Sequence, residues 1–312
     1  MNPSTKNIAL LRAYTKYEIS DSNMGLGVTT GMKKAFQSIK NSGSKIMILA
    51  IILFGIKTSV QAQESKHANS KMNQIAEINT LLKPKVIVFD VNETLLDLSP
   101  LKKSVGEALN GREDLLPLWF STMLHYSLVE TLSDNYHPFG EIGTAALMMV
   151  AKTQGIDMKY EDAKSSIVTP LRSLQAYPDV VPGLKAFNKG TYHIVSLTNS
   201  SAIGVETQFK NAGLTDYFEK RYTIGSIKKY KPHPDTYQMV LDDLQVKPEE
   251  VLMVAVHAWD LAGAKNVGFQ TAFVARPGKV LYPNVDEPDY VVKNITELVS
   301  ILQKKYAEDM NK

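Results

Sequence analysis

The stretch Lys85–Asp97 constrains the fold of this chain more than any other. It begins with the apolar run Val86–Phe89, which ends abruptly at Asp90 and a series of further polar residues. A continuous apolar run of this length is typical of a strand that is buried on both faces of a parallel sheet. Ligands of such sheets bind at the carboxyl ends of the strands, which is where Asp90 is expected. We therefore interpret Asp90 as a candidate nucleophile.

Further apolar runs alternate with helical patterns in the second half of the chain. Strands are predicted at 192–197, 222–225, 251–256, 271–274 and 290–292. Helices are predicted at 184–190, 205–212, 234–244, 261–267 and 295–305. Strands that alternate with helices in this way predict a doubly wound parallel sheet of the α/β class.

Between the first two predicted strands the chain shows helical patterns alone. Apolar residues recur there at intervals of three and four, which predicts helices at 98–111, 113–132, 139–153 and 161–175. We interpret residues 98–177 as an inserted helical cap, and residues 84–97 and 178–303 as the core domain. An insert directly after the strand that carries Asp90 is placed to close over the end of the sheet.

The first 66 residues differ in charge from the rest of the chain. They carry nine Lys or Arg and three Asp or Glu, whereas the remaining residues have a balance of −3. The mild overall basicity is thus a property of these first 66 residues, and it predicts no surface for nucleic acid. The chain has no cysteine, which excludes disulfides, thiolate metal sites and a cysteine nucleophile.

The leader, residues 1–62, has the features of a secretory signal peptide. Lysines precede the apolar run Ile46–Ile56, and the small-residue site Val60–Ala62 follows it. The sequence predicts a signal peptide over about 32–62, a polar linker at 63–83, and export to the periplasm. An uncleaved anchor is the alternative, although the apolar run is shorter than the roughly 20 residues of a membrane span.

Polar clusters follow the predicted strands or lie in the loops beside them. They are Asp90 with Glu93 and Thr94, Thr198 with Asn199, Lys231, and His257 with Asp260. In a doubly wound sheet such clusters can converge in one crevice. Each cluster alone is a weak signal. All of them together, in this order and with a helical insert after the first, form a specific signal.

The motifs that carry these residues resemble those of the haloacid dehalogenase-like superfamily, in particular its type II (S)-2-haloacid dehalogenase branch. They are Phe89–Asp97, Leu118–Ser127, Ser196–Asn199, Lys231–Tyr237 and His257–Ala264. The resemblance covers about 85–303, and Trp259 is a mark of the dehalogenase branch. It implies a Rossmann-like core with a helical cap, and an enzyme that hydrolyses (S)-2-haloacids to (R)-2-hydroxy acids.

The resemblance also implies a reaction of two steps on Asp90. The carboxylate displaces halide from C2 of the substrate, and water then hydrolyses the resulting ester. Lys231 would neutralise and orient Asp90, while Asp260 would hold Lys231 or the water in place. We expect Glu93 and His257 to activate the water, because a carboxylate beside an imidazole fixes its tautomer and raises its basicity.

Six further residues are candidates for contact with the substrate: Thr94, Trp119, Phe120, Thr198, Asn199 and Tyr237. The two threonines and the asparagine would hold carboxylates by hydrogen bonds. Trp119 and Phe120 are equally well explained as core of the cap, and Tyr237 as helix packing. Related enzymes have an arginine that receives the halide directly after the cap tryptophan. Phe120 stands there instead, and an aromatic edge attracts an anion less strongly.

A phosphatase of the same superfamily is the first alternative. Such phosphatases have an acid two residues after the nucleophile and another near the last motif, where this chain has Asn92 and Val256. An amide cannot act as a general acid, and a hard dication needs several oxygen ligands. We therefore predict a site without a metal or other cofactor.

The second alternative is a binding protein that keeps the fold without the chemistry. The expected partners of an active enzyme are a small 2-haloacid and water, not nucleic acid, and the sequence leaves a homodimer open.

Overall fold

The computed structural model describes residues 81–187 and 191–307. The predicted signal peptide and most of the predicted linker lie outside these residues. The end of the linker is held on the core, because the Leu82 carbonyl accepts hydrogen bonds from Gln270 Nε2 (2.8 Å) and the Tyr306 hydroxyl (2.9 Å). Within the described ranges no helix has the length and apolar character needed to cross a membrane.

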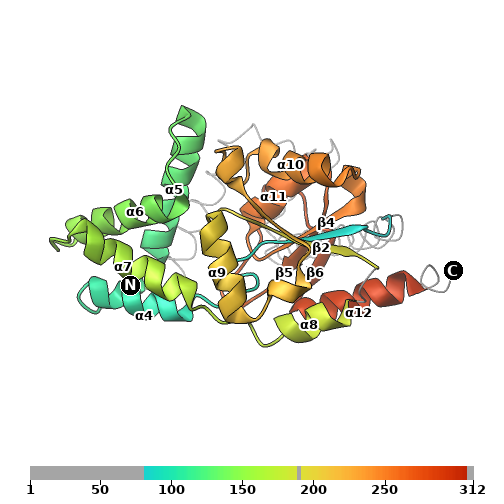
Figure 1. Cartoon of the computed structure of the whole chain (residues 1–312), viewed down its shortest axis with the longest axis horizontal. Helices are drawn as coiled ribbons and strands as arrows, with labels where there is room; N and C mark the ends of the chain where they lie inside the picture. Colours follow the sequence, from blue (N-terminus) through green and yellow to red (C-terminus); the bar gives the residue numbers. More distant parts are fainter. Residues whose placement is uncertain (1–80, 188–190, 308–312) are drawn as a thin grey trace, which may run out of the picture. The chain divides into compact units, whose positions relative to one another are not determined.

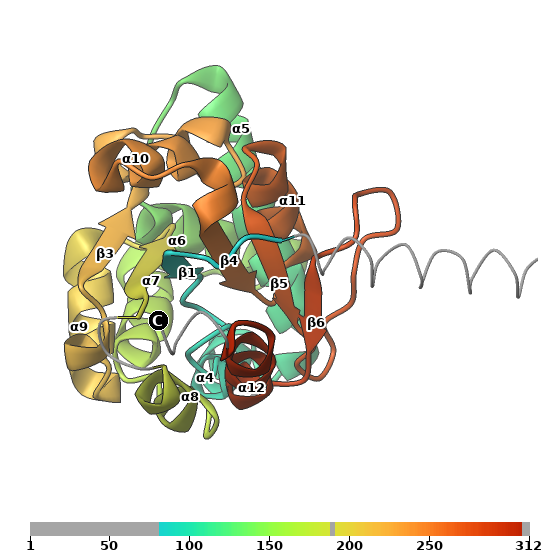
Figure 2. The ribbon, with the colours of Figure 1, turned by 90° about the vertical axis from the view of Figure 1, so that its right-hand side faces the viewer.

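A parallel sheet forms the core, and the described residues contribute six strands to it (Figure 2). These are β1 (Val86–Phe89), β2 (His193–Thr198), β3 (Lys220–Thr223), β4 (Val251–Ala255), β5 (Gln270–Val274) and β6 (Tyr290–Val292). Their order is β3-β2-β1-β4-β5-β6. The chain therefore extends the sheet to one side of β1 and later returns to its other side, which places a topological switch point between β1 and β4. The predicted doubly wound α/β fold is confirmed.

Helices cover both faces of the sheet, as the side chains of β1 illustrate. Ile87 and Phe89 pack with residues of α8, α9 and α12, whereas Val86 and Val88 pack with residues of α10 and α11. Successive side chains of a strand point to opposite faces, so a strand covered on both sides is apolar throughout. The helices are α8 (Val180–Ala186), α9 (Ala202–Ala212), α10 (Pro234–Leu244), α11 (Ala258–Asn266) and α12 (Ile295–Lys305).

Five α-helices without an intervening strand separate β1 from β2, and the first four of them lie together at one side of the sheet (Figure 1). These four are α4 (Ser99–Ala108), α5 (Leu116–Ser133), α6 (Phe139–Thr153) and α7 (Tyr160–Arg172). The two connections between this cap and the core run side by side. Asp97 N donates to the Gln175 carbonyl and Tyr177 N donates to the Leu95 carbonyl, both at 2.9 Å.

Several predicted boundaries differ from the structure for local reasons. The pattern at 113–132 is divided into a 3₁₀ turn, Glu113–Leu115, and α5, which has Pro117 in its first turn. The third strand begins two residues earlier than predicted, because Lys220 and Arg221 at the sheet edge are polar. Helix α11 begins directly after the site residue His257. Three further 3₁₀ turns are Thr215–Tyr217, Ile224–Ser226 and Pro248–Glu250.

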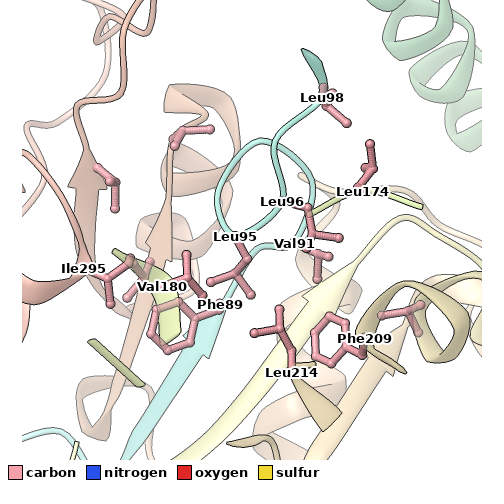
Figure 3. Packing of buried hydrophobic residues seen from close by; sticks show 14 of the residues in the cluster. Phe89, Val91, Leu95, Leu96, Leu98, Leu174, Val180, Phe209, Leu214 and Ile295 are labelled. Carbon is pink, nitrogen blue, oxygen red and sulfur yellow. The ribbon is translucent and has the colours of Figure 1, made fainter. Parts of the chain in front are cut away.

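The loop after β1 is fixed by its own apolar residues. Val91, Leu95 and Leu96 are fully buried, and Figure 3 shows them beside Phe89 in the hydrophobic core. Leu95 N and Leu96 N both donate to the Val91 carbonyl, at 2.8 and 3.1 Å, which closes the loop tightly. The polar residues of the same loop are thereby held at the carboxyl end of β1.

Candidate active site

Asp90 lies at the carboxyl end of β1, where its backbone N–H still bonds to the Val254 carbonyl of β4 at 3.0 Å. Its side chain is buried, and Oδ2 accepts a hydrogen bond of 2.6 Å from the Thr94 hydroxyl. That hydroxyl oxygen in turn accepts from Val256 N at 3.2 Å. Thr94 therefore ties the carboxylate to the neighbouring strand end and fixes its orientation.

Lys231 reaches Asp90 from the loop before α10. Its Nζ donates to Asp90 Oδ1 (2.8 Å), to Asp260 Oδ2 (2.6 Å) and to the carbonyl of β2 residue Leu197 (3.1 Å). The Tyr237 hydroxyl holds the second oxygen of Asp260 at 2.7 Å. An ammonium group has three donors, and all three are used here.

The charges of this buried group stabilise one another. Burial alone would raise the pKa of Asp90, but the nearby charge of Lys231 and the imidazole of His257 outweigh it, so the pKa lies well below its ordinary range. For Lys231 burial acts in the opposite direction and lowers the pKa. The carboxylates of Asp260 and Asp90 outweigh burial, so the pKa of Lys231 is raised. Asp90 is consequently an ionised carboxylate at neutral pH, as a nucleophile must be.

His257 approaches Asp90 from the end of β4, opposite Lys231. Its Nε2 lies 2.8 Å from Glu93 Oε2, and its Nδ1 lies 3.4 Å from Asp90 Oδ2. Nδ1 is buried and has no hydrogen-bond partner. Burial lowers the pKa of the imidazole, but the carboxylates of Asp90 and Glu93 outweigh this effect and raise it. The rings of Phe120 and Trp259 stack on the imidazole, with centroids 6.1 and 5.1 Å away.

Glu93 is itself held by two basic side chains. Besides His257 at Oε2, Lys279 Nζ lies 2.6 Å from Oε1. Burial raises the pKa of Glu93, while the hydrogen bonds and charges of His257 and Lys279 lower it further than burial raises it. The sequence reasoning missed Lys279. The signal for it is its place in the loop after β5, whose carboxyl end lies at the same edge of the sheet as Asp90.

A small pocket of about 20 Å³ lies above these groups. It is lined by Asp90, Asn92, Phe120, Leu124, Phe139, Thr198, Asn199, Lys231, His257 and Trp259. Six of the predicted site residues are in this lining. Leu124, which was missed, lies one helical turn after Phe120 and so shares its face of α5. The pocket combines a polar floor from the sheet with an apolar wall from the cap.

Three residues predicted to contact the substrate are absent from this lining. Trp119 is buried within the cap, where its indole N–H donates to the Gly143 carbonyl at 2.8 Å. Thr94 and Tyr237 are fully buried behind Asp90 and Asp260, to which their hydroxyls are bonded. In the structure Thr94 and Tyr237 support the carboxylates, as was expected for Thr94, and Trp119 supports the cap, while contact of these residues with substrate stays a prediction. Thr198 and Asn199 do line the pocket, and Asn199 Oδ1 accepts from Lys231 N at 3.1 Å.

The side-chain amide of Asn92 is held in one orientation by its neighbours. Its Nδ2 donates to Ser200 Oγ at 3.3 Å, and its Oδ1 accepts from Gln208 Nε2 at 3.1 Å. Asp260 is paired with Lys231 rather than directed at an open position. No group of three or more His, Asp or Glu side chains that could hold a metal ion is present in the part of the chain that the structure describes.

A buried aspartate between a lysine and a histidine, at the switch point of a doubly wound sheet and below a helical cap, defines a hydrolase with an aspartate-based site. The family model of haloacid dehalogenase-like hydrolases matches residues 84–268. The chain belongs to this family, within its (S)-2-haloacid dehalogenase branch.

Individual relatives agree with this assignment. (S)-2-haloacid dehalogenase 1 of Pseudomonas sp. strain CBS-3 is 30% identical over 219 residues, which cover 70% of this chain and 96% of that protein. The (S)-2-haloacid dehalogenase of Xanthobacter autotrophicus is 33% identical over 193 residues, covering 62% of this chain and 75% of that protein. A structure of L-2-haloacid dehalogenase from Xanthobacter autotrophicus with chloropropionic acid covalently bound matches with a TM-score of 0.65 at 27% identity, covering 70% of this chain and 98% of that chain.

Proposed function

We propose that this protein hydrolyses small (S)-2-haloacids to (R)-2-hydroxy acids through an ester on Asp90. The observation that carries the proposal is the placement of the buried Asp90 carboxylate between Lys231 and His257, at the floor of a small pocket. The dehalogenases to which the chain is similar support the substrate class. The covalently bound chloropropionic acid in one of them supports a covalent intermediate.

In the first step Asp90 attacks C2 of the substrate. A bond forms between a carboxylate oxygen and C2, the carbon–halogen bond breaks, and the halide leaves with the bonding electrons. Attack from the side opposite the halogen inverts C2. Because Lys231 and Thr94 already hold both oxygens of Asp90, the carboxylate needs little reorientation before it reacts.

The lining of the pocket offers groups for both ends of a small 2-haloacid. The polar groups of Thr198 and Asn199 lie at its floor, beside the charge of Lys231, and suit the carboxylate of the substrate. The leaving halide would meet the ring of Phe120 rather than an arginine, which predicts modest rates with poorer leaving groups.

In the second step water attacks the ester carbonyl of Asp90. His257 is the proposed base, because its Nδ1 has no hydrogen-bond partner and lies 3.4 Å from Asp90, while Glu93 holds Nε2. Ester formation removes the negative charge of Asp90. The pKa of His257 then falls, and the neutral imidazole accepts a proton from the water. The bond between the carbonyl carbon of Asp90 and the ester oxygen then breaks, and the leaving alkoxide takes the proton from His257 to give the hydroxy acid. The acid formed on Asp90 loses its proton to solvent, which restores the carboxylate.

The test is halide release from (S)-2-chloropropionate and bromoacetate, measured alongside phosphate release from p-nitrophenyl phosphate with Mg²⁺. We expect halide release by the wild type, and none by Asp90→Asn, since an amide is not a nucleophile here. Phosphate release that depends on Mg²⁺, without halide release, would contradict the proposal and favour the phosphatase. Release of neither halide nor phosphate would favour the second alternative, a binding protein without catalytic activity.

We also propose that the protein is exported. This proposal rests on the basic flank, apolar run and small-residue site at 32–62 alone. Mass spectrometry of the periplasmic fraction should find a mature N-terminus near Gln63. An intact Met32 segment on cytoplasmic protein would contradict it.

A further inference from the structure

A tight turn follows β5 at the same edge of the sheet as Asp90. It consists of Arg276-Pro277-Gly278-Lys279, and Lys279 N donates to the Arg276 carbonyl at 3.0 Å. Proline at the second position and a glycine with φ of +79° at the third are the pattern of a type II turn. Such a turn brings its first and last residues close together, so that both side chains can reach the loop after β1.

Arg276 anchors this turn to the loop that carries the nucleophile. Its Nε and Nη2 donate to the Thr94 carbonyl at 3.0 and 2.7 Å. Its Nη1 lies 3.0 Å from Asp179 Oδ1, and the ring of Tyr177 lies 3.8 Å from the guanidinium carbon. Arg276 is buried by these contacts. The turn is therefore held rigidly on the core, and Lys279 extends from it.

Lys279 reaches the residue that holds His257. Its Nζ lies 2.6 Å from Glu93 Oε1, and the other oxygen of that carboxylate lies 2.8 Å from His257 Nε2. Glu93 has a φ of +63°, in the left-handed region that non-glycine residues rarely adopt. The carboxylate is thus held at both oxygens by basic side chains while its backbone keeps an unfavourable conformation, which indicates a position that the fold fixes.

We propose that Lys279 is a positioning residue for ester hydrolysis, acting through Glu93 on the orientation and charge of His257. The inference rests on the proposed function of this site. A carboxylate whose charge is partly neutralised by one cation stabilises a second cation less. Lys279 thereby limits how strongly Glu93 stabilises the imidazolium form of His257, and it prevents the carboxylate from turning away from Nε2.

The surroundings of His257 leave few other groups to set its charge. The loop after β1 presents Asp90 and Glu93, and Lys231 and Asp260 lie beyond Asp90. The cap contributes the uncharged ring of Phe120, and α11 contributes that of Trp259. The contact of Lys279 with Glu93 is partly shielded from water, with 23% and 19% of the two side chains exposed. Screening by solvent is correspondingly weaker than for the surface pairs.

The experiment follows the titration of His257 by NMR in the full-length protein, with the signal assigned from His257→Gln. In Lys279→Met the positive charge behind Glu93 is lost, so we expect the pKa of His257 to rise. Lys279→Arg should restore the wild-type value. Lys265→Met is the matched control, because Lys265 is also about one quarter exposed and pairs with a carboxylate, Asp289, that does not contact the site.

The same variants are then compared in steady-state halide release. We expect Lys279→Met to lower kcat about tenfold near neutral pH, which is less than the whole contribution of a general base. We also expect the acid limb of the pH profile of kcat to move to higher pH. A purely structural role would lower kcat equally at every pH. An unchanged His257 titration in Lys279→Met would overturn the inference, even in an active enzyme. A wild type that releases no halide would contradict the proposed function instead, and the NMR result would stand by itself.

Discussion

The two sides of Asp90 are built differently. On one side, Lys231 uses all three of its donors on Asp90, Asp260 and the Leu197 carbonyl. On the other, His257 Nδ1 lies 3.4 Å from Asp90 and has no hydrogen-bond partner. An ammonium whose donors are all used keeps its proton more firmly than an imidazole nitrogen that makes no hydrogen bond. The contrast supports the proposal that Lys231 holds the nucleophile and that His257 activates the water.

The largest effect is expected on the Lys231 side. Lys231→Met leaves the buried Asp260 without a basic partner and Asp90 with His257 alone, which we expect to cost about 3–5 kcal/mol of unfolding free energy. Loss of the group that orients the nucleophile should also lower halide release by about 10³-fold. Urea unfolding and initial rates measure the two losses. Lys220→Met, which breaks a half-exposed pair with Asp243, is the control and should change both quantities little. Equal losses of stability and of halide release in Lys231→Met and Lys220→Met would contradict a special role of Lys231 at the nucleophile.

His257→Gln should separate the two chemical steps. The nucleophile remains, so one equivalent of halide is released per site in a burst, while kcat falls about 10²–10⁴-fold because the base is missing. Mass spectrometry should then find the ester on the peptide that contains Asp90. Normal turnover by this variant, or the absence of a burst, would show that His257 does not serve the second step.

Asp90→Asn should change the titration of His257. The amide is neutral, as the ester is, and so it removes one of the two carboxylates that raise the pKa of the imidazole. We expect NMR to show a lower pKa of His257 in Asp90→Asn than in the wild type. A value that does not move would mean that ester formation cannot release the base.

The smallest expected effect is on stability as a function of pH. Because the folded-state pKa of His257 is raised, its ion pairs contribute stability that is fully present below the unfolded pKa of about 6.5 and lost as pH rises through the folded value. The difference in unfolding free energy between the wild type and His257→Gln should therefore be larger at pH 6 than at pH 9. The contribution of Asp90 is constant over this interval, since its pKa is lowered and lies far below it. A difference that grows with pH would contradict the sign.

The sequence predicted the parts of the fold that depend on local patterns. The apolar run of β1 and the polar residues after it placed Asp90 correctly at a strand end. The edge strand β3 was located less well, because its exposed Lys220 and Arg221 do not form an apolar run. Periodicity also showed that Trp119 faces an apolar surface. It did not distinguish the interior of the cap from the pocket, and the structure places Trp119 in the cap.

The contacts of the site were predictable only where a strand end or a known motif indicated them. The 2.8 Å contact of Glu93 with His257 joins residues 164 positions apart, and it was expected from their places after β1 and β4. Arg276 and Lys279 follow β5 but belong to no motif that was identified. Their role depends on how a turn directs two side chains, and a linear pattern does not contain that information.

The central claim, that Asp90 becomes an ester which water cleaves at its own carbonyl, is tested most directly by a single turnover in H₂¹⁸O with excess enzyme. The account predicts one ¹⁸O atom in the side chain of Asp90 and none in the hydroxy acid, because the product keeps an oxygen that came from the aspartate. Incorporation of ¹⁸O into the hydroxy acid in the first turnover, with an unlabelled Asp90, would show that water attacks C2 directly and would contradict the account.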